Sequence, residues 1–475
     1  MIAGLLLFLV FPLVIGAVVY VLRRWTAVTA LLSIGTTLAL GVAIVILPLG
    51  RTVEVWGRQI VMGGSLSFLG RELILEEVDR IAIAFLYLTG SGTFLLASRM
   101  SPTSLLFPVG FGVLSLLSGS LLIRPLIYAV LLIEIAVAIS LFALQKERGS
   151  PTLGGLKYLS FSLLAMPGLL VINWLMDRYG LTPDNTELRD AAAILMTVSF
   201  ALLLGSVPFH WWMPSLAEDG EPLTASFVLT VNYGAVWFLF LGFLETYPEL
   251  SAYGQFGSLT SGIGLAMVTI GGVLAAAQRS PGRILGYGAL VDGGAALIGF
   301  GLSNQKGLAL ALLCLFARPF GLSLMAAGLK GWTRRGGKEW HGDEARDLAR
   351  VAPWSTLSFV VGGLSTAGLP VTAGFGARWA LYRGIGGSRP VSVLLMMMAS
   401  GGLMIGMWRI LSSVVAGADG PGTEGAKWEP AEGDRWLTAV VIVVAVAGCA
   451  LVGIGPQLLA PTAARLASLY TFLAP

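Results

Sequence analysis

Apolar residues occur along this chain in long runs, each close to the length of a membrane-spanning helix. A helix needs about 20 predominantly apolar residues to cross the hydrocarbon core of a bilayer. Runs of this kind, bounded by charged residues, proline or glycine, follow one another from end to end. They cover residues 2–22, 26–48, 78–98, 104–123, 125–144, 156–176, 190–212, 223–244, 258–277, 284–302, 307–329, 354–381, 391–413 and 436–460. The pattern predicts an all-α polytopic membrane protein with about 14 transmembrane helices.

The composition also indicates a membrane protein. Of the 475 residues, 56% are hydrophobic and only 12% are charged, whereas soluble domains contain about 25% charged residues. So few charges leave too little polar surface to cover a water-facing protein. The formal net charge of +4 is small and spread over the loops, so the sequence gives no indication of nucleic-acid binding.

Basic residues favour alternate loops between the runs. Because Lys and Arg are enriched in cytoplasmic loops, these loops are predicted to be cytoplasmic and both termini to lie on the opposite side. The first run ends at two arginines without a small-residue cleavage site, which favours a retained span over a signal peptide. The basic residues are Arg23, Arg24, Lys146, Arg148, Arg279, Arg283, Lys330, Arg334, Arg335 and Lys338.

The sequence lacks the usual patterns for a redox centre. Its two cysteines, Cys314 and Cys449, lie in different apolar runs, and its two histidines, His210 and His341, are far apart. There is no CxxC pair or Cys/His cluster for a metal or an iron–sulfur cluster. There is also no GxGxxG turn between a strand and a helix for a dinucleotide. The sequence therefore predicts a protein without a cofactor of its own.

Two of the runs contain residues that interrupt a helix. The first leads into SVPFHWWMPSLAEDGEPLTASF, with Pro208 near its start, and the second contains GGLSTAGLPVTAGFGARWALY, with Gly368, Pro370 and Gly374. A proline removes a backbone donor and clashes with the preceding turn. In hydrocarbon, the freed backbone groups are tolerated only inside protein or beside a wet cavity. The alternative is a pair of ordinary proline kinks, which are common in membrane helices.

Two interrupted helices five spans apart are typical of duplicated halves that each contribute a broken helix to an ion path. We therefore expect two inverted five-helix repeats, each with one broken helix. The expected units are 1–103 (N-terminal spans), 104–245 (first repeat, break near 206–210), 246–413 (second repeat, break near 368–374) and 414–475 (a loop, a last span and a tail along the surface).

Several ionisable residues lie inside apolar runs, where a charge is costly and by default marks a functional site. Glu134 is nearly mid-span, and the alternative for it is a neutral, hydrogen-bonded packing acid. His210 titrates in a range suited to proton relay, unless it caps the interrupted helix. Asp292 lies among small residues. Arg318 and Arg378 are the only cations deep in the runs, and an arginine pairs with an acid but does not hand on a proton.

Three acids, Glu218, Asp219 and Glu221, follow the first predicted break. On the predicted topology they lie on the cytoplasmic side, where they would guard an entrance or simply solvate a turn. For Glu221, which directly precedes Pro222, we favour the solvated turn.

The segment PFHWWMPSLAEDGEPLTA resembles the PFHxWLPDAxxxAPTPVSA signature of the antiporter-like membrane subunits of respiratory complex I. Relatives of these subunits occur in photosynthetic complex I, membrane-bound hydrogenases and multi-subunit cation/proton antiporters. Glu134 falls where the family has its fifth-span glutamate. Further segments resemble the family along nearly the whole chain: LEEVDRIAIAF with Asp79, GGLKYLSFSLLA, RILGYGALVDGGAALIGFGL and GLPVTAGFGARWALY.

The resemblance implies fourteen spans and two broken helices, the first of which would line a half-channel for protons. It also implies partners, namely the other membrane subunits of a complex I-like assembly, with quinone bound elsewhere in the complex. The implied location is the inner membrane of a prokaryotic cell, or a thylakoid or similar energy-converting membrane.

Four positions depart from the family's pattern. Leu203 and Arg378 stand where the family has lysines, Asn232 stands where it has a lysine or histidine, and Asp292 replaces a histidine. Pumping in the family is thought to use that chain of lysines, paired against the glutamate. A leucine cannot bind a proton, and an arginine will not release one. The fold therefore follows from the resemblance, whereas pumping does not follow unqualified.

Two functions remain open. In the first, the chain translocates protons or cations, with Glu134, His210 and Asp292 titrating and with Asn232 and water filling the gaps. In the second, it is a non-translocating subunit that holds a membrane arm together. A subunit of a multi-subunit cation/proton antiporter is a further alternative, whereas a free-standing transporter would need a polar substrate-binding cluster that the sequence does not show.

Two states of the buried charges are expected. Without a lysine at position 203, Glu134 should be protonated near neutral pH unless Arg124 or a cation of a neighbouring subunit reaches it. The fixed charge of Arg378 would repel an arriving cation by about 4 kcal/mol at 4 Å and an effective dielectric of 20. We expect Asp292 to pair with Arg378 and relieve that repulsion.

Overall fold

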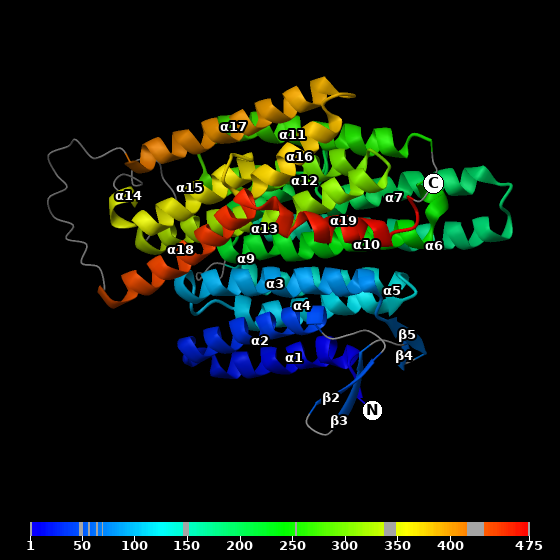
Figure 1. Cartoon of the computed structure of the whole chain (residues 1–475), viewed down its shortest axis with the longest axis horizontal. Coiled ribbons are helices and arrows are strands. Elements are labelled where there is room, and N and C mark those ends of the chain that lie inside the picture. Colours follow the sequence, from blue (N-terminus) through cyan, green and yellow to red (C-terminus); the bar gives the residue numbers. More distant parts are fainter. Residues whose placement is uncertain are drawn as a thin grey trace.

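The computed structural model describes residues 2–46, 51–55, 58–62, 65–68, 70–145, 152–251, 254–336, 348–415 and 432–473. Long helices lie side by side in one elongated bundle, and many of them pack on helices distant in the sequence, such as α11 on α17 (Figure 1). The N-terminal helices form one edge of the bundle in this view, and the later helices form the rest.

The helices follow the predicted apolar runs closely. Their bounds are α1 (Leu5–Val21), α2 (Thr26–Ile46), α3 (Glu77–Met100), α4 (Leu106–Leu122), α5 (Ile127–Leu144), α6 (Leu153–Leu181), α7 (Thr186–Leu203), α8 (Trp212–Asp219), α9 (Pro222–Phe227), a π-helix (Val228–Asn232), α10 (Tyr233–Thr246), α11 (Phe256–Ala277), α12 (Pro281–Phe300), α13 (Gln305–Gly336), α14 (Leu348–Val351), α15 (Pro353–Ala367), α16 (Ala373–Ile385), α17 (Pro390–Val415), α18 (Glu432–Ile454) and α19 (Ala460–Leu469).

Ten of the described helices are long and apolar enough to cross a membrane, and α4 is a shorter apolar helix. This confirms the predicted all-α polytopic membrane protein. The full count of fourteen would also need α12, which contains Arg283 and Asp292, and the two interrupted helices. That count and the four predicted units stay predictions, and most of the loop that begins at residue 414 lies outside the described residues.

Two small sheets were not predicted from the sequence. Strands β1 (Ile2–Ala3), β3 (Arg58–Met62) and β2 (Arg51–Val55) form one, in that order, and β4 (Ser65–Phe68), β5 (Arg71–Ile74) and β6 (Ile123–Arg124) form the other. In the second sheet β5 pairs antiparallel with both neighbours, so the segment between α2 and α3 is joined to the α4–α5 connection. Strands of two to five residues give little periodic signal beside helices of about 20.

The centre of the bundle is the helix formed by α9, the π-helix and α10. Every residue from 221 to 241 is buried, so this helix touches protein on all sides. Its residues are apolar on every face, and a helix of this kind is stable only where protein or lipid surrounds it. Aromatic rings pack against it, for example Phe94 against Phe227 with centroids 6.1 Å apart.

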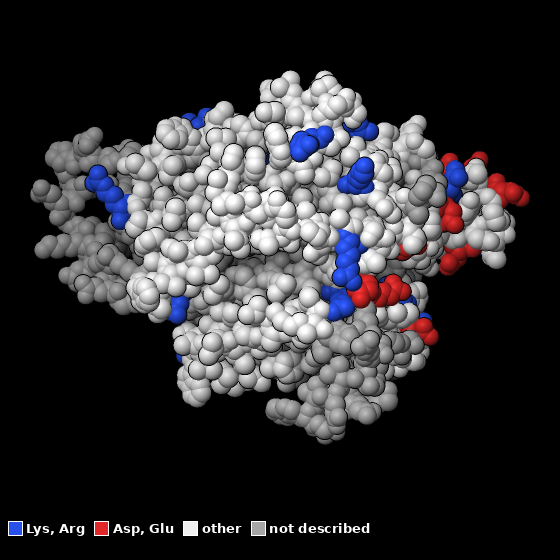
Figure 2. All heavy atoms as spheres, viewed as in Figure 1, with Lys and Arg blue, Asp and Glu red and all other residues white. Residues whose placement is uncertain are grey.

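Both described ends of the chain lie at the same end of the bundle, as the predicted topology requires (Figure 1). Figure 2 shows acidic side chains gathered at that end, where the connection between α6 and α7 contains Asp184 and the first turn of α7 contains Glu187. Of the basic residues used to predict the cytoplasmic side, Lys146, Arg148 and Lys338 lie outside the described residues. The tail forms α19, which packs one face against α13 and α3, with Leu466 fully buried, and exposes Arg465 and Ser468 on the other.

Glycines allow α12 to pack closely on α8, the second half of the first interrupted helix. A Cβ atom at Gly286 would lie 2.4 Å from the Cα atom of Pro214, which is far inside van der Waals contact. At Gly262, on α11, a Cβ atom would meet nothing within 4 Å. An added methyl group is therefore expected to destabilise the protein at Gly286 but not at Gly262.

We predict that Gly286→Ala destabilises the folded chain by about 1–3 kcal/mol, as overpacking usually does. Gly262→Ala is the matched control and should melt like the unchanged protein. The measurement is the thermal melting temperature of the purified chain in detergent. Equal melting temperatures for both variants would contradict the close packing of α8 on α12.

Candidate functional site

The first interrupted helix ends at Leu203 and resumes at Trp212, so the break predicted near 206–210 is confirmed. Gly205 adopts a left-handed conformation with a φ of 60°. Its N–H bonds the carbonyl of Leu202 (3.3 Å), and the N–H of Ser206 bonds that of Ala201 (2.8 Å). This pair of bonds is a Schellman motif, which satisfies the last carbonyls of a helix.

The second interrupted helix ends in the same way. Helix α15 stops at Ala367, Gly368 has a φ of 76°, and α16 begins at Ala373, which confirms the break predicted near 368–374. The N–H of Gly368 bonds the carbonyl of Ser365, and that of Leu369 bonds the carbonyl of Leu364, both at 3.0 Å. Two proline-containing spans thus contain true breaks, which excludes the alternative of ordinary kinks.

The breaks are only partly interior. Ser206, His210 and Thr372 are buried, but Pro208 and Val371 are exposed on the surface of this chain. Within this chain each break is therefore covered by protein on one side only. At membrane depth, non-helical backbone is not stable against lipid.

Glu134 lies on α5 beside a small cavity lined by Ser162 of α6 and Leu203 of α7. The Ser162 hydroxyl donates to Glu134 Oε2 at 2.5 Å, and Oε1 is buried without a hydrogen-bond partner among the described residues. Leu203 therefore stands next to the glutamate, as the family resemblance implied. Arg124, considered as a counter-charge, instead lies 3.7 Å from Asp79.

Asn232, in the π-helix, joins three elements of the first half. Its Nδ2 donates to the hydroxyls of Ser140 on α5 (3.1 Å) and Tyr158 on α6 (3.5 Å). The Tyr158 ring packs on Trp212 of α8, with centroids 4.6 Å apart. The predicted bridging position of Asn232 is consistent with this geometry. Asn232 contacts α5, which bears Glu134, and α6, whose Tyr158 packs on the broken helix.

His210 is buried and its ring stacks on Trp211 with centroids 4.9 Å apart. Neither ring nitrogen makes a well-aligned hydrogen bond in the described part of the chain, although the imidazole lies close to the backbone of Pro208. Because that contact lies within the break, capping of the interrupted helix stays an alternative to a relay role.

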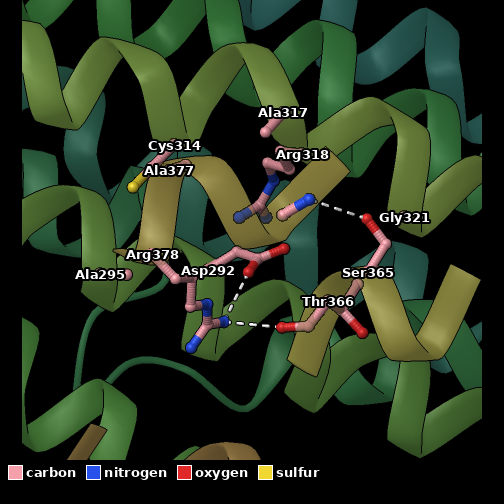
Figure 3. A pocket seen from close by; sticks show the side chains of 11 residues that line it. Asp292, Ala295, Cys314, Ala317, Arg318, Gly321, Ser365, Thr366, Ala377 and Arg378 are labelled. Atoms are coloured by element: carbon pink, nitrogen blue, oxygen red, sulfur yellow. Dashed lines mark hydrogen bonds and ion pairs between the residues drawn. The ribbon is translucent and has the colours of Figure 1, made fainter. Parts of the chain in front are cut away.

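Asp292 and Arg378 form the predicted pair, and Figure 3 shows their side chains pointing toward one another. Arg378 Nη2 lies 2.8 Å from Asp292 Oδ1 and also donates to the carbonyl of Thr366 at 2.7 Å. That carbonyl belongs to the last turn of α15, so Arg378 both neutralises the acid and satisfies the broken helix. The Arg378 side chain packs over the break, since a Cβ atom at Gly368 would lie 2.8 Å from its Cδ.

Arg318, on α13, lines the same cavity as Asp292 and Arg378. Its Nε donates to the carbonyl of Leu229 (2.8 Å) and its Nη1 to that of Ala289 (2.7 Å). The guanidinium lies over the ring of Tyr233, 4.0 Å from the centroid. Two cations and one acid thus face one another where α12, α13, α15 and α16 meet.

The interpretation of Glu221 as a solvated turn is wrong. Glu221 is buried and caps α9, accepting from the Thr224 N–H at 2.7 Å, with Lys330 Nζ at 3.6 Å. An acid directly before a proline at the first helical position is a known N-terminal signature, so the signal was present in the sequence. Glu218 pairs with Arg283 at 2.5 Å, and Asp219 accepts from the Gly154 N–H, so these acids join the end of α8 to the first turns of α12 and α6.

Sequence reasoning missed three of the groups that complete the site. Ser162 and Tyr158 are four residues apart and therefore share one face of α6, next to Glu134 and Asn232 respectively. This spacing was the signal that could have found them. The Thr366 carbonyl is a backbone group and leaves no trace in the sequence.

A family model described as NADH:quinone oxidoreductase/Mrp antiporter, transmembrane, matches residues 153–406. NADH-quinone oxidoreductase subunit N of Rhodococcus opacus is 29% identical over 219 residues, which cover 44% of this chain and 39% of that protein. Subunit N of Acidithiobacillus ferrooxidans is 27% identical over 294 residues, covering 58% and 59%. The chain thus spans about half the length of these curated relatives.

Solved structures share the fold over nearly the whole chain. One is a chain of the Mrp complex from Dietzia, with a TM-score of 0.80 and 17% identity over 98% of this chain and 97% of that chain. Another is a chain of respiratory complex I from Thermus thermophilus, with a TM-score of 0.74 and 18% identity over 98% and 100%. At these identities the likeness shows the fold.

We predict that Arg378→Met destabilises the chain by about 3–5 kcal/mol, because it leaves Asp292 buried without its partner. Replacing both residues in Arg378→Met/Asp292→Leu should recover most of the loss. Arg465→Met is the control, since Arg465 pairs with Glu77 at an exposed site and such pairs contribute about 0–1 kcal/mol. Melting temperatures in detergent measure all three, and an unchanged melting temperature for Arg378→Met would refute a structural role of the pair.

Glu134 was predicted to be protonated near neutral pH unless Arg124 reaches it. Arg124 lies beside Asp79 instead, so it does not act as the counter-charge of Glu134. Infrared difference spectra at pH 7 should show the C=O stretch of a protonated carboxyl that is lost in Glu134→Gln. In Ser162→Ala the same band should shift, because the hydrogen bond to the carboxyl is removed. A carboxylate band lost in Glu134→Gln would show the opposite state.

Proposed function

The chain belongs to the NADH:quinone oxidoreductase/Mrp antiporter family of membrane subunits, and on that premise we propose that it is an antiporter-like subunit in the membrane arm of a complex I-like assembly. In this role it takes part in translocating protons or other cations, coupled to electron transfer to quinone. Quinone and the redox centres lie in other subunits. The membrane is the inner membrane of a prokaryotic cell, with a thylakoid-type membrane as the alternative.

The observation that supports translocation most directly is the environment of Glu134. A carboxyl at mid-membrane depth costs several kcal/mol and is retained chiefly for function. Here one carboxyl oxygen is held by Ser162 while the other is buried and unpartnered beside a cavity. Such a group accepts a proton or a hydrogen bond from water entering that cavity. His210, neither of whose ring nitrogens makes a well-aligned hydrogen bond in the described part of the chain, is a second group of this kind.

The second half of the chain supports a different role. Arg378 keeps its charge at all accessible pH values, and its pairing with Asp292 and Thr366 is complete. A paired arginine neither receives nor releases a proton. We therefore propose that proton exchange belongs to the first half, around Glu134, and that the Asp292–Arg378 pair is a fixed barrier in the second.

A non-translocating structural subunit is the second candidate. Leu203 beside Glu134 and the closed Asp292–Arg378 pair favour it, because neither position provides a titrating base. Both candidates place the chain within a larger assembly. Counting the ions moved per electron by the whole assembly distinguishes them.

The surface of the breaks supports membrane partners. Trp211 and Val371 are 56% and 57% exposed, next to Pro208 and Pro370 in the non-helical segments. Because lipid cannot satisfy non-helical backbone, other membrane subunits are the partners that fit these segments. The solved structures with this fold are of chains in multi-subunit complexes.

The test compares ions moved per electron in the reconstituted assembly bearing Glu134→Gln or His210→Ala. We expect a clear fall in Glu134→Gln, because an amide cannot take up the proton. Glu187→Gln, an exposed acid in the first turn of α7, is the control and should leave the ratio unchanged. An unchanged ratio in both test variants, with electron transfer and assembly intact, would establish the structural role.

A further inference from the structure

Arg318 connects the two halves of the chain through backbone carbonyls. It lies on α13, yet its Nε bonds Leu229 in the π-helix and its Nη1 bonds Ala289 on α12. The side chain is 3% exposed, and its Nη2 faces the Asp292 cavity without a hydrogen-bond partner among the described residues (Figure 3). Two of its three nitrogens are therefore committed to positioning backbone.

The carbonyl of Leu229 is available because of the π-helix. In an α-helix the N–H of Tyr233 would bond the carbonyl of Leu229, four residues earlier. Here that N–H bonds the carbonyls of Thr230 and Val228 instead. The Leu229 carbonyl, which would accept from the Tyr233 N–H in an α-helix, accepts from Arg318 Nε instead. This bond favours the π-helical register.

A second contact fixes the same register from the side chain. The Tyr233 ring lies under the Arg318 guanidinium, with 4.0 Å between Cζ and the ring centroid. A Cβ atom at Gly293 would lie 2.3 Å from the Tyr233 hydroxyl, so only glycine leaves room for this ring position. Arg318 thus holds the ring face of Tyr233, the residue that follows Asn232, while Gly293 leaves room for its hydroxyl.

We propose that Arg318 is a positioning residue that holds the π-helix and thereby aims Asn232 at Ser140 and Tyr158. Returning residues 228–232 to an α-helix would turn Asn232 by about 100°, one residue's rotation, and break both of its hydrogen bonds. The role of Asn232 in ion movement rests on the proposed function. The effect of Arg318 on the register stands independently of it.

Arginine suits this position better than lysine. Its planar fork directs several N–H groups at fixed angles and stacks on an aromatic ring, whereas lysine offers one compact ammonium. Lysine at 318 would keep the charge next to Asp292 but would reach only one of the two carbonyls. Arg318→Lys therefore tests the helical register of residues 228–232 without removing the positive charge beside Asp292.

The first readout is a cryo-EM structure of the assembled complex with Arg318→Lys. We expect residues 228–232 to be α-helical and the Asn232 amide to have left Tyr158. Arg389→Lys is the matched control, since Arg389, in the connection before α17, also donates to another element, to Ser261 on α11 at 2.7 Å, and should retain the π-helix. Gly293→Ala, which displaces the Tyr233 hydroxyl, should lose it. A π-helix kept in both Arg318→Lys and Gly293→Ala would overturn the proposal.

The second readout is ions moved per electron in Arg318→Lys, Asn232→Ala and the double variant. If Arg318 acts through Asn232, each single change lowers the ratio and the double lowers it no further than Asn232→Ala alone. Additive losses would overturn this coupling. An unchanged ratio in Glu134→Gln would refute translocation, and the cryo-EM result would still decide whether Arg318 sets the register.

Discussion

Backbone groups at membrane depth must find partners within the protein, and the centre of this chain is arranged around that constraint. Each interrupted helix ends in a glycine-centred Schellman motif, at Gly205 and at Gly368, which satisfies the freed carbonyls locally. Where local bonds do not suffice, an arginine supplies them, Arg378 at the second break and Arg318 at the π-helix. The irregular backbone therefore determines where the buried cations lie.

This use of arginine separates the two halves chemically. In the first half, Glu134 has a single hydroxyl partner and no arginine within ion-pair distance among the described residues. In the second, Asp292 is paired with Arg378 and lies in the field of Arg318. A change of charge at Glu134 involves one hydrogen-bond partner, Ser162, whereas a change at Asp292 would disturb helix ends and packing together. The two breaks thus have similar helix ends, but Glu134 in the first half has only a hydroxyl partner, whereas Asp292 in the second is paired with an arginine.

Much of this could be predicted from the sequence because it is local. The run at 26–48 became α2 (Thr26–Ile46), and prolines and glycines marked both breaks. The pairing of Arg378 with Asp292 was predictable because a buried fixed charge requires an opposite one. What could not be predicted includes backbone acceptors such as the Thr366 carbonyl that binds Arg378, because a carbonyl group is not encoded by the identity of a side chain. The cap at Glu221 could have been predicted from its place directly before Pro222, because proline is common at the first position of a helix.

The helix at the centre of the bundle has a consequence for how the protein is made. Residues 222–241 are enclosed by other helices in the finished fold, yet this segment is synthesised before α11 to α19 exist. Because it is apolar on every face, lipid can surround it until those helices arrive. Its side chains must therefore be compatible with two environments in succession, the bilayer during biogenesis and the protein interior afterwards. A charged side chain placed there would meet an unfavourable environment at both stages.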